Sequence, residues 1–194
     1  MNAYNHLSAF LQGIYPLSDA EMAAMLAVWQ PFSARRKEIL TQEGQTERYA
    51  YFVLEGVQRA CFTHPDGRDI TLVFTYPYSF SGIADSFLLQ KPSKFTFETL
   101  TPSQFLRAPY VAVKSLMDEH RSIERLLFRA TAVALEGVLY RQAELQSFSS
   151  EEKFRALLSR SPHVLTLIPH KYLASYIGVD ATNFSKLLNS IRIS

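Results

Sequence analysis

Apolar residues change their spacing twice along the chain, which divides it into a helical, a strand-like and a second helical region. Residues 4–12 and 18–29 have the spacing of amphipathic helices. Ser18 and Glu21 form a capping-box pair at the start of the second helix, and Pro31 ends it. The chain is therefore expected to begin with two short helices.

Between residues 32 and 109 the helical spacing disappears, and short β-like runs alternate with turns that contain glycine or proline. The strands expected here are 38–41, 49–55, 57–63, 70–76, 95–99 and 104–108. Asp66-Gly67 is the strongest hairpin signal among the turns. Because no helical pattern is interleaved, this region is expected to form an antiparallel sandwich or jelly roll.

Residues 118–146 return to helical spacing without a proline. Positions spaced alternately by four and three residues give this helix a coiled-coil-like pairing face, formed by Ile123, Leu127, Ala130, Ala134 and Gly137. A β-roll cannot bury a whole helix of this length, so part of the face is expected to meet a second copy of the chain. The alternative, packing wholly against its own strands, stays open because the periodicity fits both. A short helix is expected at 150–160.

Residues 169–192 predict two short helices hinged at Gly178. The apolar positions are Leu173, Ala174 and Ile177, then Phe184, Leu187, Leu188 and Ile191. Asp180 is a suitable N-cap for the second helix. This is the helix-turn-helix pattern, although an ordinary helical hairpin fits these residues equally well. The candidate DNA-contacting side chains are Lys171, Thr182, Asn183, Ser185, Lys186 and Asn189.

Charge is unevenly distributed along the chain. The net charge is +2, but residues 153–194 hold six basic side chains and one acidic one, while the rest has a net charge of −3. A basic C-terminal end favours a polyanionic partner, unless the unevenness is due to chance.

Several classes of protein are excluded by composition. Cys61 is the only cysteine, so one chain can form neither a disulfide nor a four-cysteine metal site. No apolar run reaches membrane-spanning length, and residues 1–21 lack the pattern of a secretory signal, so a cytoplasmic protein without membrane contact is expected. No catalytic triad, phosphate-binding glycine loop or metal cluster is visible, so we expect no enzyme, no metal and no cofactor.

The order of small helices, β-roll, long helix and helix-turn-helix resembles the Crp/Fnr family of bacterial transcription regulators. The most specific segments are ILTQEGQTERYAYFVLEGVQRACFTHPDGRDITLVF, with the turn glycines Gly44 and Gly56, and IPHKYLASYIGVDATNFSKLL. The resemblance implies an α+β fold with an effector domain at 1–117, a dimerisation helix at 118–147 and a DNA-binding domain at 148–194. Since the sequence ends at Ser194, no β-hairpin wing is expected after the last helix.

The resemblance also implies an effector pocket, at which this sequence departs from the cyclic-nucleotide-binding members. Gly82 matches their glycine, but Ile83 replaces the glutamate that holds the ribose. Ser93 or Lys94 falls where they have the arginine that pairs with the cyclic phosphate. We therefore expect weak or absent binding of cyclic AMP. The pocket candidates are Gly82, Ile83, Ala84, Ser93, Lys94 and Phe95. The cavity is expected either to hold another small-molecule effector or to be filled by side chains such as Phe87, Phe95 and Phe97.

The function implied is that of a homodimeric DNA-binding transcription regulator, with double-stranded DNA, a second copy of the chain and RNA polymerase as partners. In the second helix of the motif, Ala181 is suited to a thymine methyl group and Lys186 to a phosphate. The alternative is a ligand-binding or protein-docking module on the same fold that lacks DNA-binding activity.

Overall fold

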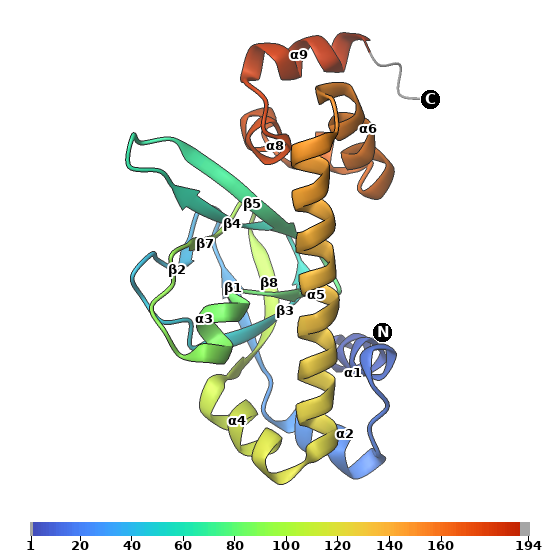
Figure 1. Ribbon diagram of the computed structural model, residues 1–194. Coiled ribbons are helices and arrows are strands. Elements are labelled where there is room, and N and C mark those ends of the chain that lie inside the picture. The colour runs from blue at the N-terminus through green and yellow to red at the C-terminus, as the bar shows by residue number, and fades with distance from the viewer. Residues whose placement is uncertain (1, 191–194) are drawn as a thin grey trace. The chain divides into compact units, whose positions relative to one another are not determined.

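The computed structural model describes residues 2–190 (Figure 1). Ile191 and Arg192, which the sequence assigns to the last apolar stripe and to the basic end, lie outside the described residues. The helices are α1 (Ala3–Ile14), α2 (Asp19–Ala27), α3 (Ala84–Leu89), α4 (Tyr110–Glu119), α5 (Arg121–Ser147), α6 (Ser150–Arg160), α7 (Val164–Leu167), α8 (His170–Ile177) and α9 (Ala181–Ser190). The strands are β1 (Gln30–Ala34), β2 (Ile39–Thr41), β3 (Tyr49–Glu55), β4 (Gln58–Thr63), β5 (Asp69–Thr75), β6 (Phe80–Ser81), β7 (Thr96–Thr99) and β8 (Ser103–Pro109).

The chain forms two compact units. The roll unit comprises Met1–Ala60 and Phe74–Ala134, and the helical unit comprises Cys61–Val73 and Leu135–Ser194. No helix within residues 2–190 is long and apolar enough to cross a membrane.

The strands form two four-stranded sheets in the orders β1-β8-β3-β6 and β2-β7-β4-β5. In the first sheet β3 and β8 pair antiparallel, with Tyr51 opposite Arg107 and Phe52 opposite Leu106. All six strands expected from the sequence are present, and the antiparallel roll is confirmed.

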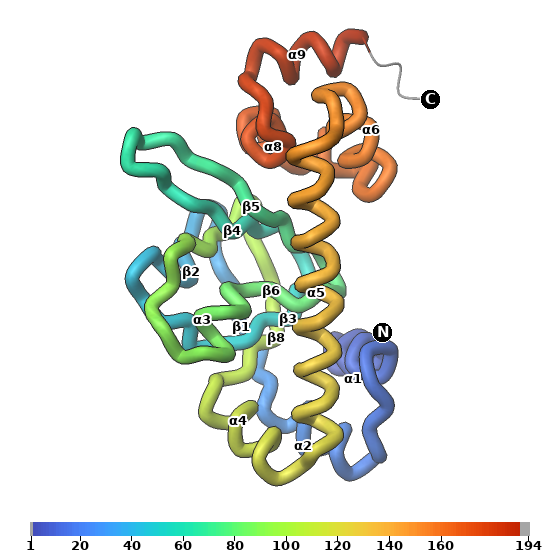
Figure 2. Tube along the Cα trace, viewed as in Figure 1, coloured from blue at the N-terminus to red at the C-terminus, as the bar shows by residue number. Residues whose placement is uncertain are grey.

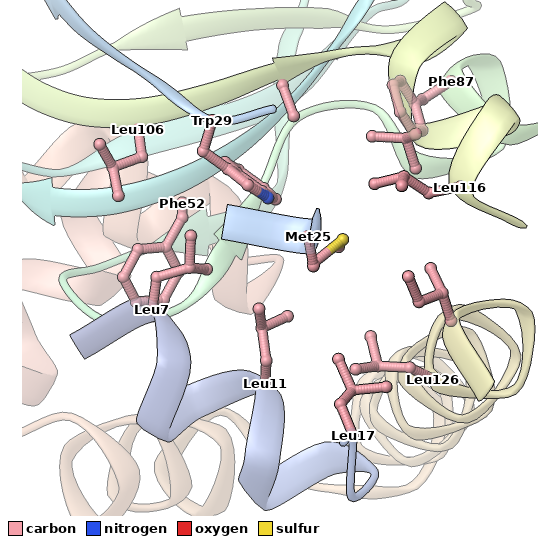
Figure 3. Packing of buried hydrophobic residues seen from close by; sticks show 13 residues of the cluster. Leu7, Leu11, Leu17, Met25, Trp29, Phe52, Phe87, Leu106, Leu116 and Leu126 are labelled. Carbon is pink, nitrogen blue, oxygen red and sulfur yellow. The ribbon is translucent and has the colours of Figure 1, made fainter. Parts of the chain in front are cut away.

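Alternation along β3 and β8 sends neighbouring residues to different cores. Phe52 and Leu106 join the helical side of the sheet, where Leu7, Leu11 and Met25 come from α1 and α2 (Figure 3). We call this the outer cluster. Tyr51 and Phe105 point to the other face and join Phe97 in an inner cluster. The roll therefore separates two apolar cores.

Two helix boundaries differ from the prediction, and the strand β1 was not predicted. The sequence places the start of the long helix at residue 118, but residues 118 and 119 belong to α4, and His120 has an extended backbone that separates α4 from α5. Figure 2 traces α4 leading directly into α5. The second N-terminal helix ends at Ala27 rather than residue 29. β1 follows and includes Pro31, which is tolerated because β1 lies at the edge of its sheet.

The turn between β3 and β4 requires glycine. Gly56 has φ +91°, and a Cβ atom there would lie 2.5 Å from the carbonyl oxygen of Pro102 and close to Ser103. Gly67, in the hairpin between β4 and β5, has a similar φ of +87° but no atom within 4 Å of the corresponding position. The two glycines thus share a backbone conformation and differ in crowding.

Gly56→Ala should lower the free energy of unfolding by about 3 kcal/mol, because backbone strain and overpacking add. Gly67→Ala should cost only about 1 kcal/mol, the strain alone. Chemical denaturation of both variants measures the difference, and equal losses would show that the contact with Pro102 and Ser103 is unimportant.

Candidate functional site

Two helices of the helical unit, α8 and α9, form the predicted helix-turn-helix. α8 ends at Gly178, whose φ of 70° and ψ of 37° place it in the left-handed region. The Gly178 N–H donates to the Ser175 carbonyl at 3.1 Å, and the Val179 N–H donates to the Ala174 carbonyl at 3.0 Å. This hydrogen-bonding pattern is a common helix termination with glycine. The hinge predicted at Gly178 is confirmed.

Asp180 starts the second helix of the motif. Its carboxylate accepts a hydrogen bond from the Asn183 backbone N–H at 2.8 Å, as an N-cap does. Phe184 then packs edge-on against Phe154 of α6, with ring centroids 5.4 Å apart. Capping and packing together fix the direction of α9 relative to α6 and α8.

The solvent-facing side of α9 is small and polar. Thr182, Ser185, Lys186 and Asn189 are exposed and share one face by their helical spacing. Asn183 departs from the prediction, because it is partly buried and its side-chain amide donates to Ser150 of α6 at 3.5 Å. Four of the five α9 candidates therefore lie on one accessible surface.

Lysines supply the positive charge near this surface. Lys171, on α8, is exposed, and its ammonium group lies 4.6 Å from the centroid of the Tyr172 ring. Lys186 forms an ion pair with no residue between 2 and 190. By contrast, Arg155 pairs with Glu151. Lys186 is thus available to a phosphate.

A hairpin segment belongs to the same unit and is hydrogen-bonded to α8. The Ser175 hydroxyl accepts from the Thr71 N–H at 2.9 Å and donates to the Asp69 carbonyl at 3.0 Å. This contact was not predicted, because Ser175 has no feature in the sequence that distinguishes it from a solvated helix residue. It attaches the first helix of the motif to the start of β5.

A buried carboxylate joins three helices of the helical unit. Glu144, on α5, is 1% exposed and accepts hydrogen bonds from Arg141 at 2.8 Å and from Arg160 of α6 at 2.9 Å. The Arg141 guanidinium also donates to the carbonyl of Tyr176 on α8 and lies 4.1 Å from the centroid of the Tyr176 ring. Burial opposes ionisation of Glu144, but the hydrogen bonds from Arg160 and Arg141 outweigh it and hold the pKa of this carboxyl below its usual value.

The interior of the β-roll is occupied by aromatic side chains. Tyr51, Phe97 and Phe105 are each at most 2% exposed, and the Tyr51 ring lies 5.7 Å from Phe97 and 5.4 Å from Phe105 by centroid distance. Phe95 packs against the same inner cluster, whereas Phe87 belongs to the outer cluster. Of the three phenylalanines that the sequence proposes as fillers, two therefore contribute to the inner cluster.

Two charged residues in the roll unit were missed by sequence reasoning. The Arg107 guanidinium lies 4.0 Å from the Phe32 ring centroid and 4.4 Å from that of Tyr49. Glu47 is 1% exposed and accepts a hydrogen bond from the Thr41 hydroxyl at 2.7 Å. Desolvation raises the pKa of Glu47 despite this hydrogen bond. Arg107 lies two residues after Phe105 and therefore shares its inward strand face. That spacing was the one sequence signal for either residue.

The predicted pocket residues Gly82, Ile83 and Ala84 lie at the start of α3, next to the buried Glu47. Gly82 has φ +110°, and a Cβ there would lie 3.3 Å from the Tyr51 ring and 3.4 Å from a Glu47 carboxylate oxygen. Ile83 is 4% exposed, and its backbone N–H donates to Glu47 at 3.5 Å. Ala84 begins α3. The backbone of Gly82 and Ile83 therefore lies against the buried carboxylate of Glu47.

The residues predicted to face the phosphate do not form an anion site. The Ser93 hydroxyl is used within its own loop, since it donates to the Phe95 carbonyl at 2.8 Å and accepts from the Phe95 N–H at 2.9 Å. Lys94 is exposed. Neither side chain supplies a buried positive charge.

The predicted pairing face of α5 is only partly accessible. Ile123 is fully buried in the outer cluster, which corrects its assignment to a dimer interface: the first turns of α5 already pack against the roll unit. Leu127 and Ala130 are partly buried, and Ala134 and Gly137 are exposed. The accessible part of α5 begins about two turns later than predicted.

Comparisons with known proteins agree with this architecture. Residues 31–120 match the family model described as the cyclic nucleotide-binding domain. A comparison with curated protein sequences found no match.

Solved structures share the fold over most of the chain. FixK2 from Bradyrhizobium japonicum has a TM-score of 0.75 at 18% identity, over 84% of this chain and 83% of that chain. A protein described as a transcriptional regulator of the crp/fnr family, from Eubacterium rectale, has a TM-score of 0.71 at 14% identity, over 91% and 86%. The c-di-GMP-responsive regulator CLP from Xanthomonas campestris has a TM-score of 0.65 at 16% identity, over 89% and 90%. The chain carries a cyclic nucleotide-binding-type domain within the fold of Crp/Fnr regulators, and the resemblance drawn from the sequence is confirmed.

Glu144→Gln should lower the stability of the helical unit by about 3 kcal/mol, because it leaves two arginines without their buried carboxylate. Glu136→Gln, at an exposed position on the same helix, is the matched control and should change stability little.

The contribution of Glu144 should also depend on pH. Because the folded pKa of Glu144 is depressed, its stabilisation is present above the unfolded carboxyl pKa of about 4.3 and is lost as the pH falls through the folded value. Denaturation of both variants at neutral and acidic pH measures these effects, and a Glu144→Gln loss no larger than the control would refute the role of the network.

Proposed function

We propose that the protein is a homodimeric DNA-binding transcription regulator in which α9 enters the major groove. The observation that carries the proposal is the exposed polar face of α9, held by a glycine-terminated α8 and an aspartate cap. A second helix presented in this way is the geometry by which helix-turn-helix proteins reach base edges. Thr182 and Asn189 are suited to base edges or phosphates, and Lys186 to a phosphate.

The charge distribution supports a nucleic-acid partner. Residues 153–190 contain five basic side chains and one acidic residue, Asp180, whose carboxylate caps α9. Phosphate neutralisation by lysine and arginine supplies most of the affinity for DNA that does not depend on sequence. Arg155 and Arg160 are paired with Glu151 and Glu144, so the positive charges of this segment without an ion pair within residues 2–190 are those of Lys153, Lys171 and Lys186, in the same unit as α8 and α9.

The middle of α5 supports a dimer. Residues 131–140 are exposed without interruption. Six large apolar side chains on α5 are more than half exposed, namely Phe128, Val133, Leu135, Val138, Leu139 and Tyr140. An apolar helix surface of this extent is unfavourable in water, and a second copy of α5 would cover it. Two copies would present two α9 helices to two half-sites.

We infer that cyclic AMP is not the effector. The inner cluster of Tyr51, Phe97 and Phe105 fills the roll, Ile83 supplies no carboxylate, and Lys94 is exposed. A cytoplasmic location and contact with RNA polymerase follow from the proposed role.

A second candidate function is a ligand-binding or protein-docking module that has lost affinity for DNA. The observation that favours it is the single cation, Lys186, on the described part of α9. Binding to duplex DNA as a function of salt separates the two functions.

The protein should bind a mixed-sequence duplex with an affinity that falls steeply with salt, by a log–log slope of roughly −0.9 for each phosphate neutralised. Lys186→Ala should weaken binding roughly tenfold or more and flatten the slope by about two per dimer. Lys91→Ala, an exposed lysine of the roll unit, is the control and should change neither quantity. Fluorescence anisotropy of a labelled duplex measures both, and no binding even at low salt would favour the docking module.

Val138→Asp should weaken dimerisation on the order of a hundredfold or more, because each subunit would bury an unpaired carboxylate. The fold should persist, since Val138 is 62% exposed in the single chain. Arg129→Asp, which lies nine residues away on the opposite side of the helix, is the control. Sedimentation velocity over a concentration series distinguishes the outcomes, and a wild-type protein that stays monomeric would contradict pairing through α5.

A further inference from the structure

A cavity of about 120 Å³ lies in the roll unit, between residues of the outer cluster and Ile83 of the inner cluster. Its walls come from α2, β3, β6, α3, α4 and α5 and include Met25, Trp29, Phe80, Phe87, Val113 and Ala130. Most of these residues belong to or pack on the outer cluster, on the face of the sheet opposite to Tyr51 and Phe105. Gly82, Ile83 and Ala84 of the predicted effector pocket also line the cavity, whereas Ser93, Lys94 and Phe95 do not. The cavity therefore adjoins that part of the predicted pocket and extends from it to Trp29.

The lining contains no charged side chain. A phosphate or carboxylate placed there would be desolvated without a counter-charge, which is costly. The cavity thus favours an uncharged occupant of mainly apolar surface.

One polar atom in the wall lacks a partner. Trp29 is 2% exposed, and its indole Nε1 has no hydrogen-bond acceptor among the described residues. Figure 3 shows Trp29 close to Met25, with Phe87 across the cluster from them, and all three residues line the cavity. A buried donor without a partner destabilises a protein, so an acceptor at this position would be favourable.

Water is a poor occupant of the cavity. A buried water molecule usually makes about three hydrogen bonds. The Thr131 hydroxyl already donates to the Leu127 carbonyl at 2.8 Å, and the Ser81 hydroxyl shares a hydrogen bond with Thr75 at 2.7 Å. The polar side-chain groups that remain in the lining are the Trp29 N–H and the Tyr49 hydroxyl, fewer than the three partners that water usually has. An apolar molecule with one acceptor suits this lining better than water does.

We propose that this cavity binds a small uncharged molecule, mostly apolar and bearing one hydrogen-bond acceptor, which accepts from Trp29 Nε1. The volume indicates a ligand near the size of a six-membered ring, since an apolar cavity of about 150 Å³ holds benzene. The acceptor is a carbonyl, ether or hydroxyl oxygen.

The cavity also touches the helix proposed to form the dimer. Leu127, Ala130, Thr131 and Ala134 of α5 all line it. An occupant would fix the packing of this helix directly before its exposed apolar stretch. Occupancy is expected to alter pairing of α5, and this consequence, unlike binding itself, rests on the proposed function.

The single tryptophan of the chain makes the test direct, because all tryptophan fluorescence reports on the cavity wall. The wild-type protein is titrated with cyclohexanone and with methylenecyclohexane, which has a similar shape but no acceptor. Cyclohexanone should change Trp29 fluorescence saturably and bind roughly two- to tenfold more tightly than the hydrocarbon. Cyclic AMP should cause no change. Equal affinity for the two probes, or no saturable response to either, would overturn the proposal.

A pair of variants tests the location. Ala130→Leu fills the cavity and should reduce the affinity for cyclohexanone at least tenfold. Ala132→Leu, two residues along α5 and outside the lining, should leave it unchanged. Circular dichroism and sedimentation check that both variants keep the fold and oligomeric state of the wild type. In a third variant, Trp29→Phe, binding is measured by calorimetry, and the preference for cyclohexanone should be lost. Unchanged binding by Ala130→Leu would refute the site. Since no readout uses DNA, a failure of DNA binding would leave this result intact.

Discussion

The strict alternation of side chains along β3 and β8 is the constraint on which the roll unit depends. Tyr51 and Phe105 fill the inner cluster, while Phe52 and Leu106 anchor α1, α2 and the start of α5 in the outer cluster. A shift of one residue in register would exchange the two sets and lose both cores. The same alternation fills the interior of the roll with aromatic rings and leaves a cavity beside Trp29, which Gly82, Ile83 and Ala84 also line.

In the helical unit, a buried ionic cluster has the corresponding role. Glu144 holds Arg141 and Arg160, so that one carboxylate of α5 is connected to α6 and, through Arg141, to the Tyr176 carbonyl of α8. Such a cluster contributes through its geometry, since buried charges offset much of their attraction by desolvation. It orients the helix that precedes Gly178, and thereby the exposed face of α9. Apolar packing of Phe154 and Phe184 completes the arrangement.

Much of this fold was predictable, because strands and helices have different apolar periods. The six strands, the capping box at Ser18 and the hinge at Gly178 each rest on a local signal. Features that depend on tertiary contact were not predictable: the break at His120, the burial of Ile123 and the Glu144 cluster join residues whose relation appears only after folding. The match of Gly82 to the family's glycine agrees with its φ of +110°, but the filling of the roll by Tyr51 and Phe105 and the unpartnered Trp29 nitrogen required the structure.

Two copies of α9, joined through α5, are proposed to read duplex DNA. Selection of bound duplexes from a random-sequence pool at low salt tests this role. Enrichment of an inverted repeat is expected, with half-site centres one helical turn apart, about 10 base pairs, or a multiple of that distance. Recovery of unenriched sequences, or of a single half-site without symmetry, would contradict it.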